Sequence, residues 1–303
     1  MAHIVTEFDA GVGIITIARA TRFNSLDVAT AQDLRRAGLQ MARDEKVRAV
    51  ILRGEGSAFC SGADLKYIAA GGEHDDLAYL TAARAVPDGY GERFKQILEY
   101  LHCTISEIRR APKPFIAAVD GVAAAGGFGL AMSCDLVFAS PRATFEWAYG
   151  KTGLTGAESS TFLLPRLVGL RRSLELMLLN PRLTAEDAAA SGLVTGVFPQ
   201  EEFDERVLAV ATSLAAGPTR AYGVAKALIN QAAGVDRIDF HLDQELQHLV
   251  RSANSDEFKE GLQAFFEKRP PVFAQPESEV AREVVSLPVG QRPGASEASV
   301  RRA

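Results

Sequence analysis

The hydrophobic pattern of this chain switches repeatedly between strand-like and helix-like stretches. Ile4, Thr6 and Phe8 alternate with polar neighbours, and a glycine turn at 11–13 leads to a second apolar stretch, which predicts an edge hairpin over the first 26 residues. Further apolar runs predict buried strands, and amphipathic runs between them predict helices. The expected strands are 47–52, 115–119, 136–139 and 143–145, and the expected helices are 27–43 and 96–110. Strands that alternate with helices indicate an α/β core.

The second half of the chain has a different character. From Glu158 onward the pattern is almost entirely helical, apart from a last strand at 193–198. We therefore expect an α/β core over 1–200, followed by a helical region over 201–275. The polar, irregular stretch near 70–93 suits a mobile insertion or lid. Residues 276–303 are rich in Pro, Ser, Gly and charge, which predicts a disordered tail.

A glycine-rich stretch at 121–129 follows the strand predicted at 115–119 and runs into a helix. Gly126 and Gly127 carry no side chain, so that a ligand or another backbone segment can approach them closely. A helix that begins here leaves free N–H groups at its positive end, and such groups stabilise an oxygen on which negative charge develops. The alternative is that the small residues only allow helix and strand to pack closely.

Composition and charge narrow the range of functions. The chain has 303 residues, 47% of them hydrophobic, which is enough for a sizeable core. A net charge of -5 argues against nucleic acid as a partner, and no apolar run approaches the ~20 residues that cross a bilayer. The N-terminus lacks the pattern of an export signal, and Cys60, Cys103 and Cys134 lack metal-ligand spacing. We therefore expect a cytoplasmic protein with no membrane association and no metal site.

Four segments each carry a distinctive motif: ARATRFNSLD at 18–27, SAFCSGADLKY at 57–67, VDGVAAAGGFGLAMSCDLVFAS at 119–140 and LTAEDAAASGLV at 183–194. Together they resemble the crotonase, or enoyl-CoA hydratase/isomerase, superfamily. The resemblance implies a spiral of ββα units followed by a C-terminal helical trimerisation region. It also implies an acyl-CoA thioester as substrate, with coenzyme A as part of that substrate and no separate cofactor.

In this family, two backbone N–H groups form an oxyanion hole for the enolate of the thioester. By position these donors fall on Ala63 and Gly126, although for Ala63 a small residue in a tight turn is the alternative. Arg22 and Lys66 suit phosphate groups, with a solvated surface charge as the equal alternative for each. The resemblance implies contacts to coenzyme A by Thr21, Arg22, Phe23, Ser61, Asp64, Leu65 and Lys66.

Family members also take an aromatic residue and a lysine from the C-terminal helix of a neighbouring subunit. Phe265 and Lys268 stand at these positions, and their spacing of three residues predicts that they share one helix face. The resemblance thus implies a homotrimer or a dimer of trimers.

The chain lacks both glutamates with which the hydratases of this family activate water. Gly129 and Tyr149 occupy those positions, so hydration by a glutamate pair is not expected. Phenylacetyl-CoA-pathway isomerases and Δ3-Δ2-enoyl-CoA isomerases use a single acid farther along, which aligns with Ala157 here. The nearest carboxylate is Glu158, which has two interpretations. It is either a catalytic base or the return partner in a capping box over 155–158.

An apolar pocket around Glu158 would exclude water and raise its pKa. Trp147 and Tyr149 alternate along a predicted extended segment and so face alike, whereas Glu146 points the other way. Ordinary core positions are the alternative for the aromatic side chains. The expected lining is Phe128, Trp147, Tyr149 and Phe162.

These residues predict an enoyl-CoA isomerase that moves a double bond through an enolate. Ala63 and Gly126 hold the enolate oxygen in this prediction, and Glu158 moves the proton. A hydratase or lyase with an unrecognised base is the first alternative. An acyl-CoA-binding protein that has lost catalysis is the second.

Overall fold

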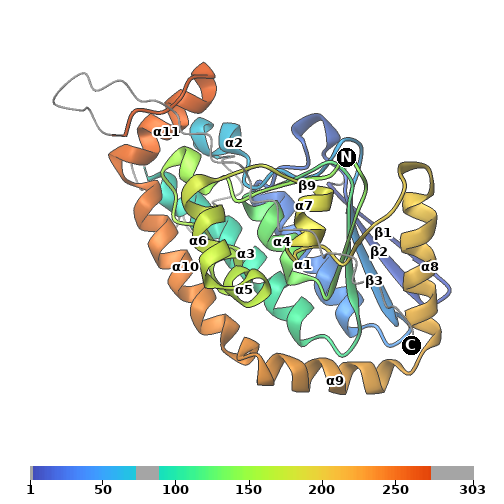
Figure 1. The fold of residues 1–303 in the computed structure, drawn as a ribbon. Helices are drawn as coiled ribbons and strands as arrows, with labels where there is room; N and C mark the ends of the chain where they lie inside the picture. The colour runs from blue at the N-terminus through green and yellow to red at the C-terminus, as the bar shows by residue number, and fades with distance from the viewer. Residues whose placement is uncertain (1–2, 73–88, 274–303) are drawn as a thin grey trace, which may run out of the picture. The chain divides into compact units, whose positions relative to one another are not determined.

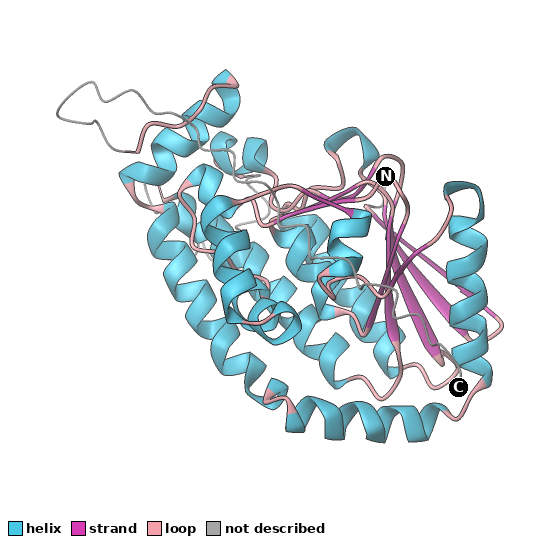
Figure 2. Ribbon diagram, in the orientation of Figure 1, coloured by secondary structure: helices cyan, strands magenta, loops and turns pink. Residues whose placement is uncertain are grey.

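Two sheets form the centre of the computed structural model, which describes residues 3–72 and 89–273 (Figure 1). Helices pack against both faces of the larger sheet (Figure 2). The insertion predicted near 70–93 falls largely outside the described residues, and the tail predicted at 276–303 falls wholly outside them. No helix in the described ranges is long and apolar enough to cross a membrane.

The larger sheet has six strands in the order β1-β2-β3-β5-β7-β10. β1 and β2 form the predicted antiparallel hairpin, and the strands from β2 to β10 run parallel. Parallel strands are covered on both faces, which accounts for the continuous apolar runs in β3 and β5. The strands are β1 Ile4–Asp9, β2 Val12–Ile17, β3 Ala49–Gly54, β5 Phe115–Val119, β7 Leu136–Ala139 and β10 Gly196–Val197.

The smaller sheet has four short strands in the order β4-β6-β8-β9. β4 follows β3 in the chain, β6 follows β5 and β8 follows β7, so that each pass of the chain contributes one strand to each sheet. A helix follows each pair of strands, which gives the ββα spiral that the resemblance implies. The strands are β4 Ala58–Cys60, β6 Val122–Ala124, β8 Thr144–Glu146 and β9 Leu183–Thr184.

Alternate residues of the central strands separate two cores. Val50 and Leu52 of β3 face the main core, which contains α1, α3 and α4. Ala49 and Ile51 face the opposite side, where Phe203 and other side chains of α8 cover the sheet. Figure 1 shows α8 beside the strands of this sheet. The helices are α1 Val28–Arg43, α2 Leu65–Ala70, α3 Tyr90–Arg110, α4 Gly126–Ser133, α5 Ser160–Val168, α6 Leu170–Leu179, α7 Ala185–Ala190, α8 Phe203–Ala216, α9 Thr219–Ala232, α10 Ile238–Ala253 and α11 Asp256–Glu267.

Local sequence signals account for several of these boundaries. Asp27 caps α1 by accepting the N–H of Thr30 at 2.8 Å, and Thr184 and Asp187 form a capping box on α7. The strand predicted at 193–198 is shorter than expected, because β10 spans two residues. The region that was expected to be helical from Glu158 onward begins with α5 at Ser160.

Candidate active site

Two backbone N–H groups face one cavity from neighbouring segments. The Leu26 N–H donates to the Gly62 carbonyl at 2.8 Å, and the Leu26 carbonyl accepts the Asp64 N–H at 2.9 Å. Because hydrogen-bonding groups alternate along an extended segment, the N–H of Ala63 faces away from Leu26. Gly126 is the first residue of α4, so its N–H has no partner within the helix. Neither amide donates to another described residue.

The two amides lie close together. A Cβ atom built on Gly62 would lie 3.1 Å from the Gly126 nitrogen, so the 61–63 loop contacts the start of α4. Ala63 and Gly126 both line a cavity of about 270 Å³. Two unpaired amides, one of them at the start of a helix, form a site for an oxygen that gains negative charge. The remaining lining comprises Ser61, Leu65, Phe94, Ala124, Ala125, Glu146, Ala148, Tyr149, Lys151, Thr152, Leu154, Glu158, Arg182, Leu249 and Phe265.

Glu158 directs its carboxyl group toward this pair of amides. A Cβ atom on Gly126 would lie 2.9 Å from Glu158 Oε1, and the Tyr149 hydroxyl donates to Glu158 Oε2. The side chain is almost inaccessible, with the residue 3% exposed. Burial raises the pKa of Glu158 to about 8, although the Tyr149 bond opposes this rise and the charge of Glu245 adds to it.

The predicted capping box over 155–158 is not formed. Ser159 is the N-cap of α5, and no side chain caps the helix from within this segment. Glu158 adopts a left-handed backbone conformation with φ of 51°, as does Ser159 with φ of 64°. The turn that these two residues make directs the Glu158 side chain into the cavity and away from the helix end.

The two positions that lack the expected acids both adjoin Glu158. Tyr149 donates its hydroxyl hydrogen to the Glu158 carboxyl group. A Cβ atom on Gly129 would lie 2.9 Å from Glu158 Cβ and would overlap the Glu158 carbonyl oxygen. Glycine at 129 therefore leaves the space that the Glu158 backbone fills. In the sequence, the missing acids at 129 and 149 look like two separate losses. In the structure, Gly129 and Tyr149 both accommodate one other carboxyl group, that of Glu158.

Glu245 of α10 supports this arrangement, and sequence reasoning missed it. Its carboxylate accepts the N–H of Ser159 at 2.8 Å, the N–H of Thr161 at 2.9 Å and the Thr161 hydroxyl. It thus caps α5 from a distant part of the chain. Burial raises the pKa of Glu245, and its hydrogen bonds partly oppose that rise. The available signal was a charged residue at a position of helical spacing between the core residues Leu242 and Leu249.

The expected aromatic lining is only partly present. Tyr149 lines the cavity, whereas Phe128, Trp147 and Phe162 are buried in the core and do not. The extended segment expected through Tyr149 ends earlier, because Ala148 has a φ of 62° and Tyr149 opens a short 3-10 helix, Tyr149–Thr152. Trp147 and Tyr149 still pack edge to face, with ring centroids 5.0 Å apart.

Glu146 was expected to point away from both Trp147 and Tyr149. It does point away from Trp147, which lies in the core, but it shares the cavity with Tyr149. Its side chain lines the cavity, where it accepts a hydrogen bond from Asn180 Nδ2 at 3.0 Å. It also pairs with Lys151 and, at 3.4 Å, with Arg182 Nε. The cavity therefore contains two carboxyl groups, one in an ionic cluster and one beside the amide donors.

The residues expected to contact coenzyme A fall into three groups. Ser61 and Leu65 line the cavity, and Thr21, Phe23 and Lys66 are exposed. Asp64 is buried, where it accepts the N–H groups that begin α2 and pairs with Arg22 Nη2 at 2.8 Å. Hydrogen bonds to Asp64 from Tyr67 and Arg22 lower its pKa against the opposing effect of burial. Asp64 and Arg22 are thus bound to each other.

Phe265 and Lys268 do not share the position predicted for them. Phe265 lines the cavity of its own chain, whereas the resemblance implied a contribution from a neighbouring subunit. α11 ends at Glu267, and Lys268 follows it as an exposed residue with φ of 55°. Phe265 and Lys268 therefore do not lie on one helix face, because Lys268 lies beyond the end of α11.

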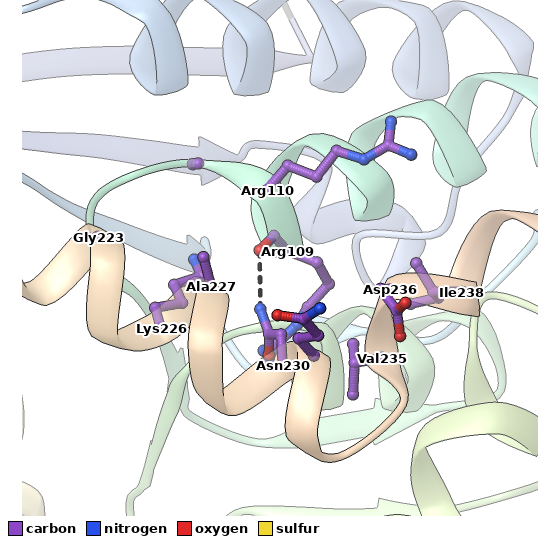
Figure 3. Close-up of a pocket in the computed structure, with 11 residues that line it drawn as sticks. Arg109, Arg110, Gly223, Lys226, Ala227, Asn230, Val235, Asp236 and Ile238 are labelled. Carbon is purple, nitrogen blue, oxygen red and sulfur yellow. Dashed lines mark hydrogen bonds between the residues drawn. The ribbon is translucent and has the colours of Figure 1, made fainter.

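A second cavity, of about 240 Å³, lies between the end of α3 and α9 (Figure 3). Asn230 Nδ2 donates to the Arg109 carbonyl at 3.1 Å, and Lys226 Nζ donates to the Ile108 carbonyl at 2.7 Å (Figure 3 shows the Asn230 bond). Lys226 also pairs with Asp135 at 2.7 Å. These polar groups satisfy the last carbonyls of α3 and fasten α9 to the core, so we assign this cavity a structural role.

Comparisons with known proteins show which family the chain resembles. A family model described as enoyl-CoA hydratase/isomerase matches residues 7–86 and 88–276. A 4-chlorobenzoyl coenzyme A dehalogenase from Arthrobacter sp. is 32% identical over 88% of this chain and 91% of its own length. A 1,2-epoxyphenylacetyl-CoA isomerase from Escherichia coli is 33% identical over 90% of this chain and 98% of its own. The crystal structure of an enoyl-CoA hydratase from Mycobacterium avium subsp. paratuberculosis is 31% identical, with a TM-score of 0.78 over 90% of this chain and 99% of the other.

Proposed function

The chain belongs to the enoyl-CoA hydratase/isomerase family, and from this premise we propose that it isomerises the double bond of an enoyl-CoA thioester through an enolate. The reaction needs donors for the enolate oxygen and one group that both removes and returns a proton. In this proposal Ala63 and Gly126 supply the donors, and Glu158 supplies the proton-transferring group.

The proposed reaction begins with a 3-enoyl-CoA whose thioester carbonyl accepts hydrogen bonds from the Ala63 and Gly126 amides. The Glu158 carboxylate removes a proton from C2, and the electron pair moves onto the carbonyl oxygen to give a dienolate. Protonated Glu158 then returns the proton to C4, which leaves the double bond between C2 and C3. Donors held on the backbone need no reorganisation, and each contributes about 3 kcal/mol of transition-state stabilisation.

The position of Glu158 is the observation that carries this proposal. Its carboxyl group lies beside Gly126, and the positions of the two hydratase acids are occupied by residues that accommodate it. A pKa of about 8 suits a group that must both take and give a proton near neutral pH. One carboxyl group suffices for transfer from C2 to C4, because no water takes part.

Purified protein assayed with hex-3-enoyl-CoA and crotonyl-CoA tests the proposal. We expect isomerisation of the first thioester and little hydration of the second. Glu158→Gln should lower the isomerisation rate by about 10²–10⁴-fold, whereas Glu205→Gln, on the exposed face of α8, should leave it unchanged. Rapid hydration of crotonyl-CoA without isomerisation would sink the proposal, and near-wild-type turnover by Glu158→Gln would remove Glu158 from it. Binding of both thioesters without turnover would select a non-catalytic acyl-CoA-binding protein.

Hydration is the second candidate, favoured by the carboxylate of Glu146 in the same cavity. A water activated by one carboxylate and a proton donated by another is the usual requirement for addition to a double bond. In this candidate Glu146 takes the part of the unrecognised base. Loss of crotonyl-CoA hydration in Glu146→Gln, in protein whose melting temperature is unchanged, is the result that it requires.

We also propose that the chain assembles as a homotrimer or a dimer of trimers. Two helices support this proposal, because α6 and α9 expose large apolar side chains that a monomer would leave in water. These side chains are Leu170, Leu174, Leu178, Val224, Leu228 and Ile229.

A further inference from the structure

A group of charged side chains lies beside the proposed enolate donors. Glu146 pairs with Ala124 between β8 and β6, and its carbonyl accepts the N–H of Ala125 at 3.1 Å. Ala125 directly precedes Gly126, so the Glu146 backbone is bonded to the residue next to one of the two donors. We call Glu146, Lys151 and Arg182 the charged group. All three residues line the cavity that contains Glu158.

The charged group carries an excess of positive charge. Lys151 and Arg182 supply two cations, and Glu146, which is 6% exposed, supplies the one carboxylate that pairs with both. Glu158 does not balance the second cation at pH 7, because its pKa of about 8 leaves it mostly protonated. The charged group therefore carries a net charge of about +1 at pH 7, which one bound anion would neutralise.

Arg182 has the free hydrogen-bond donors to hold that anion. It contacts Glu146 only through Nε, at 3.4 Å, and neither of its terminal Nη atoms bonds to another residue in the described ranges. The side chain is 66% exposed, so its outer edge is accessible from the open side of the cavity. A guanidinium group binds a carboxylate through two parallel N–H bonds, which a lysine cannot match.

We propose that Arg182, supported by Lys151, forms a subsite for a carboxylate at the far end of the acyl group. The preferred ligands are then monothioesters of dicarboxylic acids. Leu154, Leu249 and Phe265 line the same cavity and accommodate the hydrocarbon between the two ends. Glu146 orients the two cations and repels an anion placed against itself, so the ligand carboxylate meets the outer edge of Arg182. The inference rests on the proposed function for the placement of the thioester.

Binding measured without turnover tests the subsite separately from the reaction. Hexanoyl-CoA and adipyl-CoA have six-carbon acyl groups that differ in a terminal methyl or carboxylate, and neither has a double bond to isomerise. By isothermal titration calorimetry we expect adipyl-CoA to bind at least about tenfold more tightly. In Arg182→Gln the ratio of the two dissociation constants should fall to about one. Arg36→Gln, an exposed arginine of α1, is the matched control and should keep the wild-type ratio.

A phosphate of coenzyme A offers the same anionic chemistry, and the pantetheine thioesters of the two acids distinguish it. These thioesters lack the adenosine phosphates. A preference for adipyl over hexanoyl that persists with pantetheine, and is lost in Arg182→Gln, supports the subsite even if no isomerisation is found. Equal affinities of the wild-type protein for the two acyl groups would overturn it. An Arg182→Gln defect that is equal for both CoA thioesters and absent with pantetheine would assign Arg182 to coenzyme A and also overturn it.

Discussion

Tyr149 and Glu158 share a hydrogen bond that acts on the protonation of the carboxyl group. The bond favours the carboxylate and lowers the pKa of Glu158, against the larger effect of burial. Tyr149→Phe keeps the ring and removes only the hydroxyl, so the pKa of Glu158 should rise further. We expect the rising limb of kcat/KM against pH to move to higher pH, with a lower rate at pH 7. A limb that stays in place or moves down would contradict this role of the bond.

Burial of Glu158 also couples folding stability to pH. Its pKa rises from 4.5 to about 8 on folding, so the folded state holds the proton more tightly than the unfolded state. The resulting stabilisation is fully present below pH 4.5 and is lost as pH rises through 8, by about 5 kcal/mol over that window. Urea unfolding at a series of pH values should show a steeper decline for the wild type than for Glu158→Gln. Equal slopes in the two proteins would speak against the raised pKa.

Gly129 determines whether the backbone of Glu158 fits against α4. Gly129→Ala places a Cβ atom 2.9 Å from Glu158 Cβ, so Glu158 must move. We expect the free energy of unfolding to fall by about 2 kcal/mol, and activity to fall with it. Gly150→Ala is the matched control, because no atom lies within 4 Å of a Cβ built there. Unfolding in urea measures both variants, and wild-type stability of Gly129→Ala would refute the steric argument.

Residue identities were easier to predict from the sequence than their geometry. Ala63 and Gly126 follow from motif positions, Glu158 follows as the carboxylate nearest to one, and the structure brings all three to one cavity. The orientation of Tyr149 relative to Glu146 was mispredicted because strand alternation was extended past the point where the chain leaves the strand, at Ala148. The capping-box interpretation failed for a related reason. A local pattern cannot show that Glu158 adopts a left-handed conformation, which contacts from α4 and α10 impose.

At the scale of elements, side chains of α10 hold the start of α5. The two oxygens of Glu245 accept hydrogen bonds from the N–H groups of Ser159 and Thr161, which directly follow Glu158. Two successive residues with positive φ carry strain, of order 1–3 kcal/mol each, and persist where their surroundings fix them. Glu245 is therefore a positioning residue for Glu158 in the proposed reaction.

Glu245→Gln tests this coupling between helices. An amide has one oxygen, so the variant loses part of the cap, and we expect a lower rate. The variant also removes a charge that raises the pKa of Glu158, so the limb of the pH profile should move to lower pH, opposite to the effect of Tyr149→Phe. His241, whose Nε2 lies 3.8 Å from Glu245 Oε1, stays in place in both proteins. Asp243→Asn, exposed on the same helix, is the control. A lower rate with an unchanged pH profile of kcat/KM would mean that Glu245 only caps α5 and has no electrostatic effect on Glu158.

The smaller sheet was the least predictable part of the fold. β4 and β6 have three residues each and β9 has two, which is too short to show a period of two, although β8, Thr144–Glu146, was predicted one residue early at 143–145. The long strands β2, β3 and β5 and the helix α1 show clear patterns, and these were predicted with small errors at their ends. Pairing between sequence-distant short strands depends on the turn geometry of the whole spiral. Gly121, with φ of 86° between β5 and β6, is one such turn.

At the scale of the whole molecule, the site draws on segments from most of the described chain. Ala63 lies in the first third, Gly126 and Glu158 near the middle, and Phe265 in the last helix, α11. Phe265 thus reaches the cavity of its own chain. We predict that assembly of several chains can be removed without removing the site.

Leu178→Glu tests assembly and the independence of the site together. Leu178 is 70% exposed on α6, so a charge there is tolerated by the single chain but unfavourable within an apolar interface. We expect sedimentation equilibrium to give three or six chains per particle for the wild type and for Gln40→Glu, an exposed control on α1, but fewer for Leu178→Glu. The dissociated variant should still bind hexanoyl-CoA within a few-fold of wild-type affinity.

Loss of binding on dissociation, in a variant whose circular dichroism is unchanged, would mean that a neighbouring subunit completes the site after all. A wild-type protein that sediments as a single chain would contradict the proposed assembly, because the exposed leucines would then remain in water.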